Sequence, residues 1–182
     1  SMGLKKSIVI KSQFGSSYPG KYIKEYTSRE DATEALEIED YVSQYTPRRN
    51  ATEGLKQDVS DDKTVENNDN DYTYKQGVMF GNDGLSYSSK MLKECARKIQ
   101  KSTDEGHVPI MQVISFEHDY LKEKGIVSDD MKHPEYDGAY KGQVDQLKLR
   151  QSITDMMNRM HRDMGFSQPE WGASIHLDTQ HV

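Results

Sequence analysis

The chain is poor in cysteine and has no long apolar run. Cys95 is the only cysteine among its 182 residues, so no internal disulfide can form. No apolar stretch approaches the roughly 20 residues that cross a bilayer, and the first residues lack the basic and apolar regions of a secretory signal. These absences argue against a disulfide-stapled secreted domain and against a membrane protein. They predict a cytoplasmic protein with no membrane partner.

Several signature motifs are also missing. The sequence contains no glycine-rich phosphate loop, no CxxC pair, no GxSxG turn and no internal repeat. The simplest nucleotide-triphosphatase, zinc-finger and serine-hydrolase classes are therefore excluded, because each needs one of these motifs for its chemistry.

The chain is polar and mildly acidic. Apolar residues make up 34% and charged residues 30%, and the formal net charge is −6. Six acids and a single base lie between Gln57 and Asp71, so the rest of the chain is nearly neutral. The overall charge therefore neither supports nor excludes a DNA partner. The length predicts one domain over residues 1–182, with a long acidic loop over 45–71.

Hydrophobic periodicity predicts strands and helices in alternation. Ser28 followed by Asp31 resembles a capping box that would restart the first helix and carry it to about Leu36. The expected order favours an α+β fold in which helices flank an antiparallel or mixed central sheet. Strands are expected at 7–14, 72–80, 108–116 and 171–178, helices at 19–36, 88–103 and 143–164, and a turn at 81–84.

Two tyrosines lie four residues apart in the first helix. Tyr22 and Tyr26 would share a helix face, and the simplest explanation is aromatic packing. The functional alternative is a covalent nucleophile, which needs activation because the pKa of a free phenol is near 10. Arg29 follows closely and could bind a phosphate, although a solvated charge explains it equally simply.

The last twelve residues alternate between apolar and polar side chains. This pattern predicts a strand that places His176 and Asp178 on the same face. A neutral imidazole is a common metal ligand, and a nearby carboxylate can orient it. A solvated strand face with an idle histidine is the alternative.

Five further residues are weaker candidates. Lys93 and Arg97 lie on the basic side of the helix expected at 88–103, where they could contact a DNA backbone or simply be solvated. The pair Arg48 and Arg49 is a second such candidate. Glu117 lies at the exit of the strand at 108–116, where acids often precede or cap a helix; we expect Asp119 to cap the one that follows.

Four blocks, taken in order, resemble the MobP/MobL-type relaxases of mobile elements in Gram-positive bacteria, which are DNA strand transferases of the HUH class. The blocks read IVIKSQF, YIKEYTSREDA, VISFEHDYLKEKG and WGASIHLD. The resemblance implies an HUH relaxase-like fold in which a tyrosine attacks DNA at an origin of transfer and leaves a 5′-phosphotyrosine and a free 3′-hydroxyl. It also implies a histidine-bound divalent cation, Mg or Mn, and single-stranded DNA and relaxosome proteins as partners.

The resemblance assigns roles to particular residues. A motif of the form Y-[IT]-x-R-[DE] matches the run that begins at Tyr26, which makes Tyr26 the nucleophile and Tyr22 the fallback or a DNA-stacking residue. A motif that begins H-x-[DN] matches His176 and Asp178. Glu117 matches an acid that could orient a histidine or help to deprotonate Tyr26.

The two further histidines of that motif would fall at positions 183 and 185, beyond Val182. We therefore expect residues 1–182 to stop short of the full metal site, to bind metal weakly and to cleave DNA poorly.

Two other functions remain open from the sequence. One is a rolling-circle replication initiator that uses the same tyrosine and metal chemistry. The other is a catalytically silent DNA-binding accessory module. Replacement of Tyr26 by phenylalanine should abolish DNA cleavage by a relaxase or a replication initiator, whereas the silent module has no cleavage activity to lose.

Overall fold

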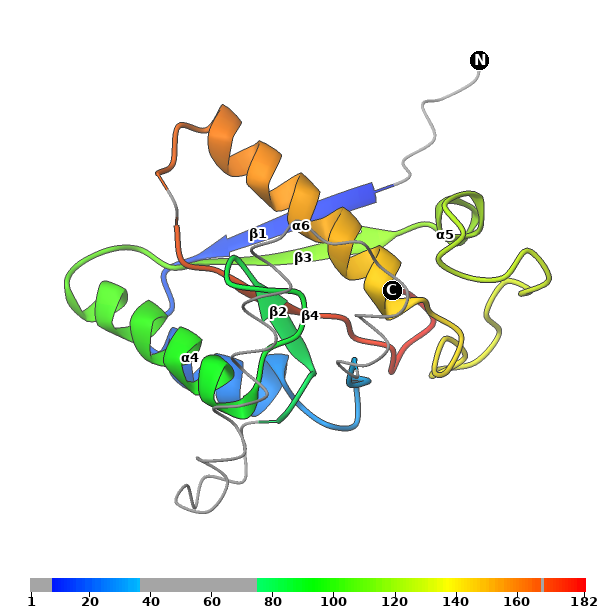
Figure 1. Ribbon diagram of the computed structural model, residues 1–182, viewed down its shortest axis with the longest axis horizontal. Helices are drawn as coiled ribbons and strands as arrows, with labels where there is room; N and C mark the ends of the chain where they lie inside the picture. Colours follow the sequence, from blue (N-terminus) through cyan, green and yellow to red (C-terminus); the bar gives the residue numbers. More distant parts are fainter. Residues whose placement is uncertain (1–7, 37–74, 168) are drawn as a thin grey trace.

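The computed structural model describes residues 8–36, 75–167 and 169–182 (Figure 1). The acidic loop predicted over 45–71, with Arg48 and Arg49, and the start of the strand predicted over 72–80 lie outside these ranges. The elements in chain order are β1 (Ile8–Phe14), α1 (Pro19–Tyr22), η1 (Ile23–Thr27), β2 (Met79–Gly81), α4 (Ser89–Asp104), β3 (Ile110–Phe116), α5 (His118–Glu123), α6 (Gln146–Asp163) and β4 (Gly172–Ser174).

The predicted α+β class is confirmed, but the sheet differs from the expectation. β1 pairs antiparallel with β3, and β2 pairs antiparallel with β4. The described strands thus form two separate two-stranded sheets instead of one central sheet. Backbone pairing between β2 and β4 is limited to three residues. After Gly81 the chain enters a tight turn, in which Gly81 forms an isolated β-bridge with Gly84.

The β2–β4 ribbon separates two layers of packing. Successive residues of a strand face opposite sides, so Phe80 points into the cluster with α6 while Met79 points into the cluster with α4. Both side chains are fully buried, and each contributes about 1.5–3 kcal/mol of transfer free energy. Figure 1 shows α6 crossing the β1–β3 ribbon, with α1 and α4 together on the other side of β2.

The two long helices form where the sequence predicts them, although α6 begins at Gln146, three residues later than expected. At the start of α4, the Ser88 hydroxyl accepts a hydrogen bond from the Met91 N–H at 3.1 Å. Asp145 accepts from the Lys148 N–H at the start of α6, and Gly165 follows the end of α6 with φ of +74°. These polar caps and the left-handed glycine set the helix bounds.

The predicted restart of the first helix is wrong. α1 widens into the π-helical turn η1, which ends at Thr27, and residues 28–36 are not helical. The Ser28 hydroxyl donates backward to the carbonyls of Ile23 and Lys24, at 3.0 and 3.1 Å. A hydroxyl committed to the preceding turn does not cap a following helix at Asp31.

A buried arginine ties α6 to the segment that follows η1. Arg150 is fully buried, and its guanidinium donates to Gln146 Oε1 and to the backbone carbonyls of Leu85 and Glu34, at 3.0–3.1 Å. Burial lowers the pKa of Arg150. The sequence analysis missed this residue, which holds the chain just after Tyr26 against the core.

Over the part of the chain that the structure describes, no helix is both long and apolar enough to span a bilayer.

Candidate active site

The π-helical turn η1 presents Tyr26 beside its neighbour one turn earlier. The rings of Tyr22 and Tyr26 lie 4.8 Å apart between centroids. Tyr26 is 41% exposed, while Tyr22 is partly buried. Desolvation and the nearby Tyr26 raise the pKa of Tyr22, and Arg29 only partly opposes that shift. Ionisation of Tyr22 is therefore disfavoured relative to a free phenol.

The end of the chain returns to this turn. His176 lies edge-on to the Tyr26 ring, with 5.4 Å between centroids. The Thr27 carbonyl, at the end of the π turn, accepts hydrogen bonds from the Ser174 hydroxyl and from His176 Nε2, the latter at 2.9 Å. Since the last carbonyls of a helix have no partner within the helix, Ser174 at the end of β4 and His176 just after it supply the missing donors.

The contact with Thr27 fixes the state of the His176 ring. A carbonyl can only accept, so Nε2 carries the proton and Nδ1 has the lone pair when the ring is neutral. No residue in the described ranges hydrogen-bonds to Nδ1. His176 thus offers one open nitrogen next to Tyr26.

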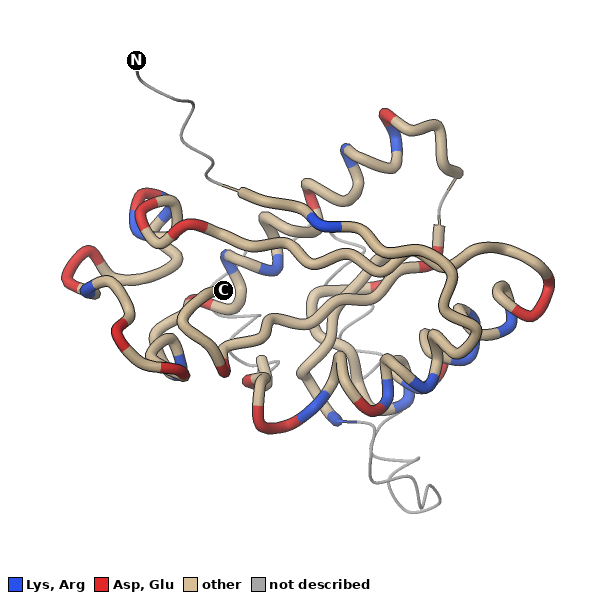
Figure 2. Tube along the Cα trace, turned by 180° about the vertical axis from the view of Figure 1, so that it is seen from behind, with Lys and Arg blue, Asp and Glu red and all other residues tan. Residues whose placement is uncertain are grey.

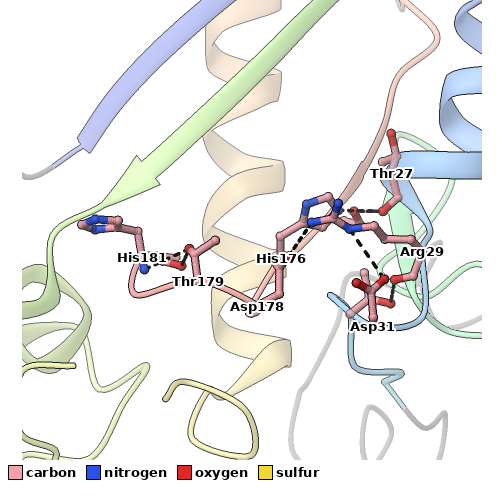
Figure 3. Close-up of polar contacts among 9 residues, drawn as sticks. Thr27, Arg29, Asp31, His176, Asp178, Thr179 and His181 are labelled. Atoms are coloured by element: carbon pink, nitrogen blue, oxygen red, sulfur yellow. Dashed lines mark hydrogen bonds and ion pairs between the residues drawn. The ribbon is translucent and has the colours of Figure 1, made fainter. Parts of the chain in front are cut away.

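Arg29 joins the two halves of the site (Figure 3). Its guanidinium carbon lies 4.4 Å from the centroid of the Tyr26 ring, and Nη2 pairs with Asp178 Oδ2 at 2.5 Å. Nε lies 3.8 Å from Asp31 Oδ1, too far for a hydrogen bond, and is buried without a hydrogen-bond partner among the described residues. Asp178 shares the polar face with His176 as predicted, but it is hydrogen-bonded to Arg29 and not to the imidazole.

The strand predicted over 171–178 is shorter than expected. β4 ends at Ser174, yet the alternation persists, since Ile175 and Leu177 remain buried. The Leu177 N–H donates to the Ala32 carbonyl at 2.7 Å. Hydrogen bonds to the segment after η1 thus replace strand pairing and keep His176 and Asp178 facing Tyr26 and Arg29.

The weaker candidates lie elsewhere. Glu117 is exposed at the N-cap position of α5, without a side-chain capping bond, and the helix starts at His118, so Asp119 lies in the first turn instead of capping it. Arg97 is exposed on α4 and paired with Glu94, and Lys93 is exposed on the same helix. The structure brings none of these residues to Tyr26.

A second histidine–tyrosine pair, which the sequence analysis missed, lies beside α5. His118 is 5% exposed, its Nδ1 accepts from the Tyr140 hydroxyl at 2.8 Å, and its Nε2 donates to the Met131 carbonyl at 2.9 Å. Burial, with Glu117 and then Asp119 nearby, raises the pKa of Tyr140 to about 12. Both ring nitrogens are satisfied, so this pair is suited to holding structure together.

The described residues do not complete a metal site. No group of three His, Cys, Asp or Glu side chains in the described ranges is placed to hold a metal ion. His176 alone is one ligand, and a firmly bound divalent cation needs several. The donor set therefore does not fit a resident metal by itself.

Comparison with known proteins identifies a family. A family model described as MobL relaxases matches residues 5–182. No curated protein and no solved structure matches the chain significantly.

Proposed function

The chain belongs to the MobL relaxase family, whose members nick DNA at origins of transfer, and from that premise we propose that Tyr26 is its nucleophile. The observation that carries the proposal is the meeting of Tyr26, Arg29 and His176, which come from opposite ends of the chain. We include in the proposal an HUH relaxase-like fold, single-stranded DNA as substrate, relaxosome proteins as further partners and the cytoplasm as location.

The proposed reaction is a transesterification. The Tyr26 hydroxyl oxygen attacks the scissile phosphorus and forms the tyrosyl–phosphate bond while the bond from phosphorus to the 3′ oxygen breaks. The phenol proton leaves to a base or to water, and the departing 3′ oxygen takes up a proton. The phosphodiester energy stays in the 5′-phosphotyrosine and is available for rejoining.

Two features favour Tyr26 over Tyr22. Tyr26 is the more exposed ring and is the one in contact with both Arg29 and His176. Partial burial raises the pKa of Tyr22, which disfavours the phenolate that attacks. Tyr22 then packs against the nucleophile or provides a surface on which a DNA base stacks.

Arg29 is the proposed phosphate contact. Its planar guanidinium matches phosphate oxygens, and its position over Tyr26 places positive charge where the attacked phosphate must sit. His176 Nδ1 has a lone pair and no hydrogen-bond partner in the described ranges, and the family generally depends on a divalent metal. Asp178 acts through Arg29 as a positioning residue.

Covalent capture of DNA tests the proposal. The protein is incubated with overlapping single-stranded oligonucleotides that tile the DNA flanking its gene. Each oligonucleotide is labelled at its 3′ end, because the tyrosine keeps the strand whose 5′ phosphate it binds. A labelled band that survives denaturation and disappears on protease treatment is expected.

The variants Tyr26→Phe and Tyr22→Phe form the matched pair. Tyr26→Phe should abolish the covalent band and leave DNA affinity within a few-fold, whereas Tyr22→Phe should retain the band. Loss of the band only in Tyr22→Phe would transfer the nucleophile to Tyr22. No band from the wild-type protein would favour the silent DNA-binding module.

A further inference from the structure

A third tyrosine continues the row that ends at Tyr26. Tyr18 precedes Tyr22 by four residues, and the Tyr22 N–H donates to the Tyr18 carbonyl at 3.2 Å. This is the bond of a first helical turn, so Tyr18, Tyr22 and Tyr26 follow one another along the α1–η1 axis. In an α-helix a step of four residues rises about 6 Å, which is the spacing along the axis expected from Tyr18 to Tyr22. The rings of Tyr22 and Tyr26 lie 4.8 Å apart between centroids, and Tyr18 precedes them at the start of the same short helical segment.

Tyr18 has no evident structural task. Its side chain is 70% exposed, and no residue in the described ranges makes a ring contact or a side-chain hydrogen bond with it. It occupies the N-cap position of α1 without capping the helix. A large aromatic side chain held in solvent beside a site is a feature of binding surfaces.

The residues between the tyrosines give this segment a positive charge in an acidic chain. Lys21 and Lys24 lie between Tyr18 and Tyr26 against the single carboxylate Glu25, two cations and one anion, while the whole chain carries −6. Lys21 pairs with Glu25 at 3.9 Å, and both side chains are more than half exposed. An exposed pair of this kind is weak, so a phosphate can compete for the lysine.

We propose that Tyr18 and Tyr22 form a stacking track for the bases of single-stranded DNA next to the phosphate that Tyr26 attacks. The identity of Tyr26 as nucleophile rests on the proposed function, whereas the track rests on Tyr18 and its cationic flank. Bases stack on aromatic rings in a sequence-tolerant way, since every base has a π face. The track therefore contributes affinity and register more than sequence choice.

Binding of a short oligothymidylate tests the track. Fluorescence anisotropy is followed with a labelled strand of about twelve nucleotides, within the usual site size of single-strand binders. Tyr18→Ala should raise Kd about ten-fold, and Tyr18→Phe should retain affinity because the ring remains. An unchanged Kd for Tyr18→Ala would overturn the proposal.

Tyr136 provides the matched control. It is 68% exposed, close to Tyr18 in this respect, but it lies between Glu135 and Asp137 in the segment between α5 and α6. Figure 2 shows acidic positions gathered along the loops between β3 and α6. Tyr136→Ala should leave Kd unchanged. An equal loss of affinity in Tyr136→Ala would show that the effect is not specific to the track.

Abasic substitution then places the contact. In the oligonucleotide that gives the covalent band, each nucleotide is replaced in turn by an abasic one. If Tyr18 stacks on one base, Tyr18→Ala should cost nothing further on the strand that lacks this base. Full additivity at every position would refute stacking.

The two proposals fail in different ways. If the wild-type protein forms the covalent band and Tyr18→Ala binds DNA normally, the track is wrong and the proposed function stands. If Tyr18→Ala weakens binding but no protein form ever yields the band, the track stands and the proposed nucleophile fails.

Discussion

The described residues include two histidine–tyrosine pairs that differ in how their polar atoms are used. His118 and Tyr140 are almost fully buried, hydrogen-bonded to each other, and both nitrogens of the imidazole have partners. His176 and Tyr26 meet ring to ring at the surface, and only Nε2 of the imidazole is bonded within the described ranges. The His118–Tyr140 pair is thus a closed contact, because both ring nitrogens have partners. The His176–Tyr26 pair is an open site, because Nδ1 has no partner among the described residues.

This difference shows what separates a structural site from a reactive one. A buried polar group must be satisfied, because an orphaned one costs about 1–3 kcal/mol. A reactive group must keep one polar atom without a protein partner, within reach of a substrate. This costs little only where the atom is exposed, so that water can hydrogen-bond to it until the substrate binds. The Thr27 carbonyl satisfies one nitrogen of His176 and leaves the other open.

The largest effect on the reaction is expected at His176. His176→Ala removes the open nitrogen beside Tyr26, so we expect the rate of covalent-band formation to fall by about a hundred-fold or more. Stability should fall by only about 1 kcal/mol, since one hydrogen bond to Thr27 is lost. Quantified gels and urea unfolding measure the two effects. A rate close to wild type would place the chemistry elsewhere.

At His118 the balance should reverse. His118→Ala opens a cavity and leaves the Tyr140 hydroxyl and the Met131 carbonyl without partners, which should lower the free energy of unfolding by about 3 kcal/mol. At a temperature where the variant is folded, its covalent-band rate should stay within a few-fold of wild type. An unfolding curve that overlays the wild type would contradict the closed contact.

Alkaline pH sharpens the comparison at Tyr140. An unfolded tyrosine ionises near pH 10, whereas the pKa of the folded Tyr140 is raised to about 12. The folded state keeps its proton longer, so this stabilisation is complete below pH 10 and is lost as the pH rises from 10 to 12. Tyr140→Phe should lose less stability than wild type over that window, although it starts about 1 kcal/mol lower. Thermal unfolding at pH 8 and pH 11 gives the comparison.

The smallest effect is expected at the ion pair of the open site. Asp178→Asn keeps the shape of the side chain and removes its charge from Arg29. We expect a stability loss of about 1 kcal/mol and a few-fold drop in the covalent-band rate. If Asp178 acts through Arg29, adding Asp178→Asn to Arg29→Gln should have no further effect. Additive losses would mean that Asp178 has another partner in the reaction.

The sequence predicted much of this arrangement because its signals are local. The serine cap marked the start of α4, Gly165 marked the end of α6, and the alternation after Trp171 placed His176 and Asp178 on one face. Tyr26 was identified by its resemblance to a motif. The contact between its ring and His176 could not be derived from periodicity, because it joins residues 150 positions apart.

The misses come from long-range contacts. Ser28 was expected to cap a new helix, but its hydroxyl bonds backward into the π turn. Arg150 falls within a helix pattern that gives no reason to bury it, since its partners are carbonyls from distant segments. The role of His118 was missed because its partner Tyr140 lies 22 residues away in the sequence. Local pattern cannot show which polar groups the tertiary fold will bring together.

The π-helical turn makes the geometry of the site depend on the length of the chain. Its closing bond runs from the Ser28 N–H to the Ile23 carbonyl, five residues back instead of four. Removing one residue between them would restore an ordinary α-helix. The residues that follow would then be rotated by about 100° about the helix axis. Arg29 would then leave the face of Tyr26, although every side chain of the site would still be present. Along this segment, insertions and deletions should be tolerated far less well than substitutions, so relatives are expected to vary in residue type but not in spacing.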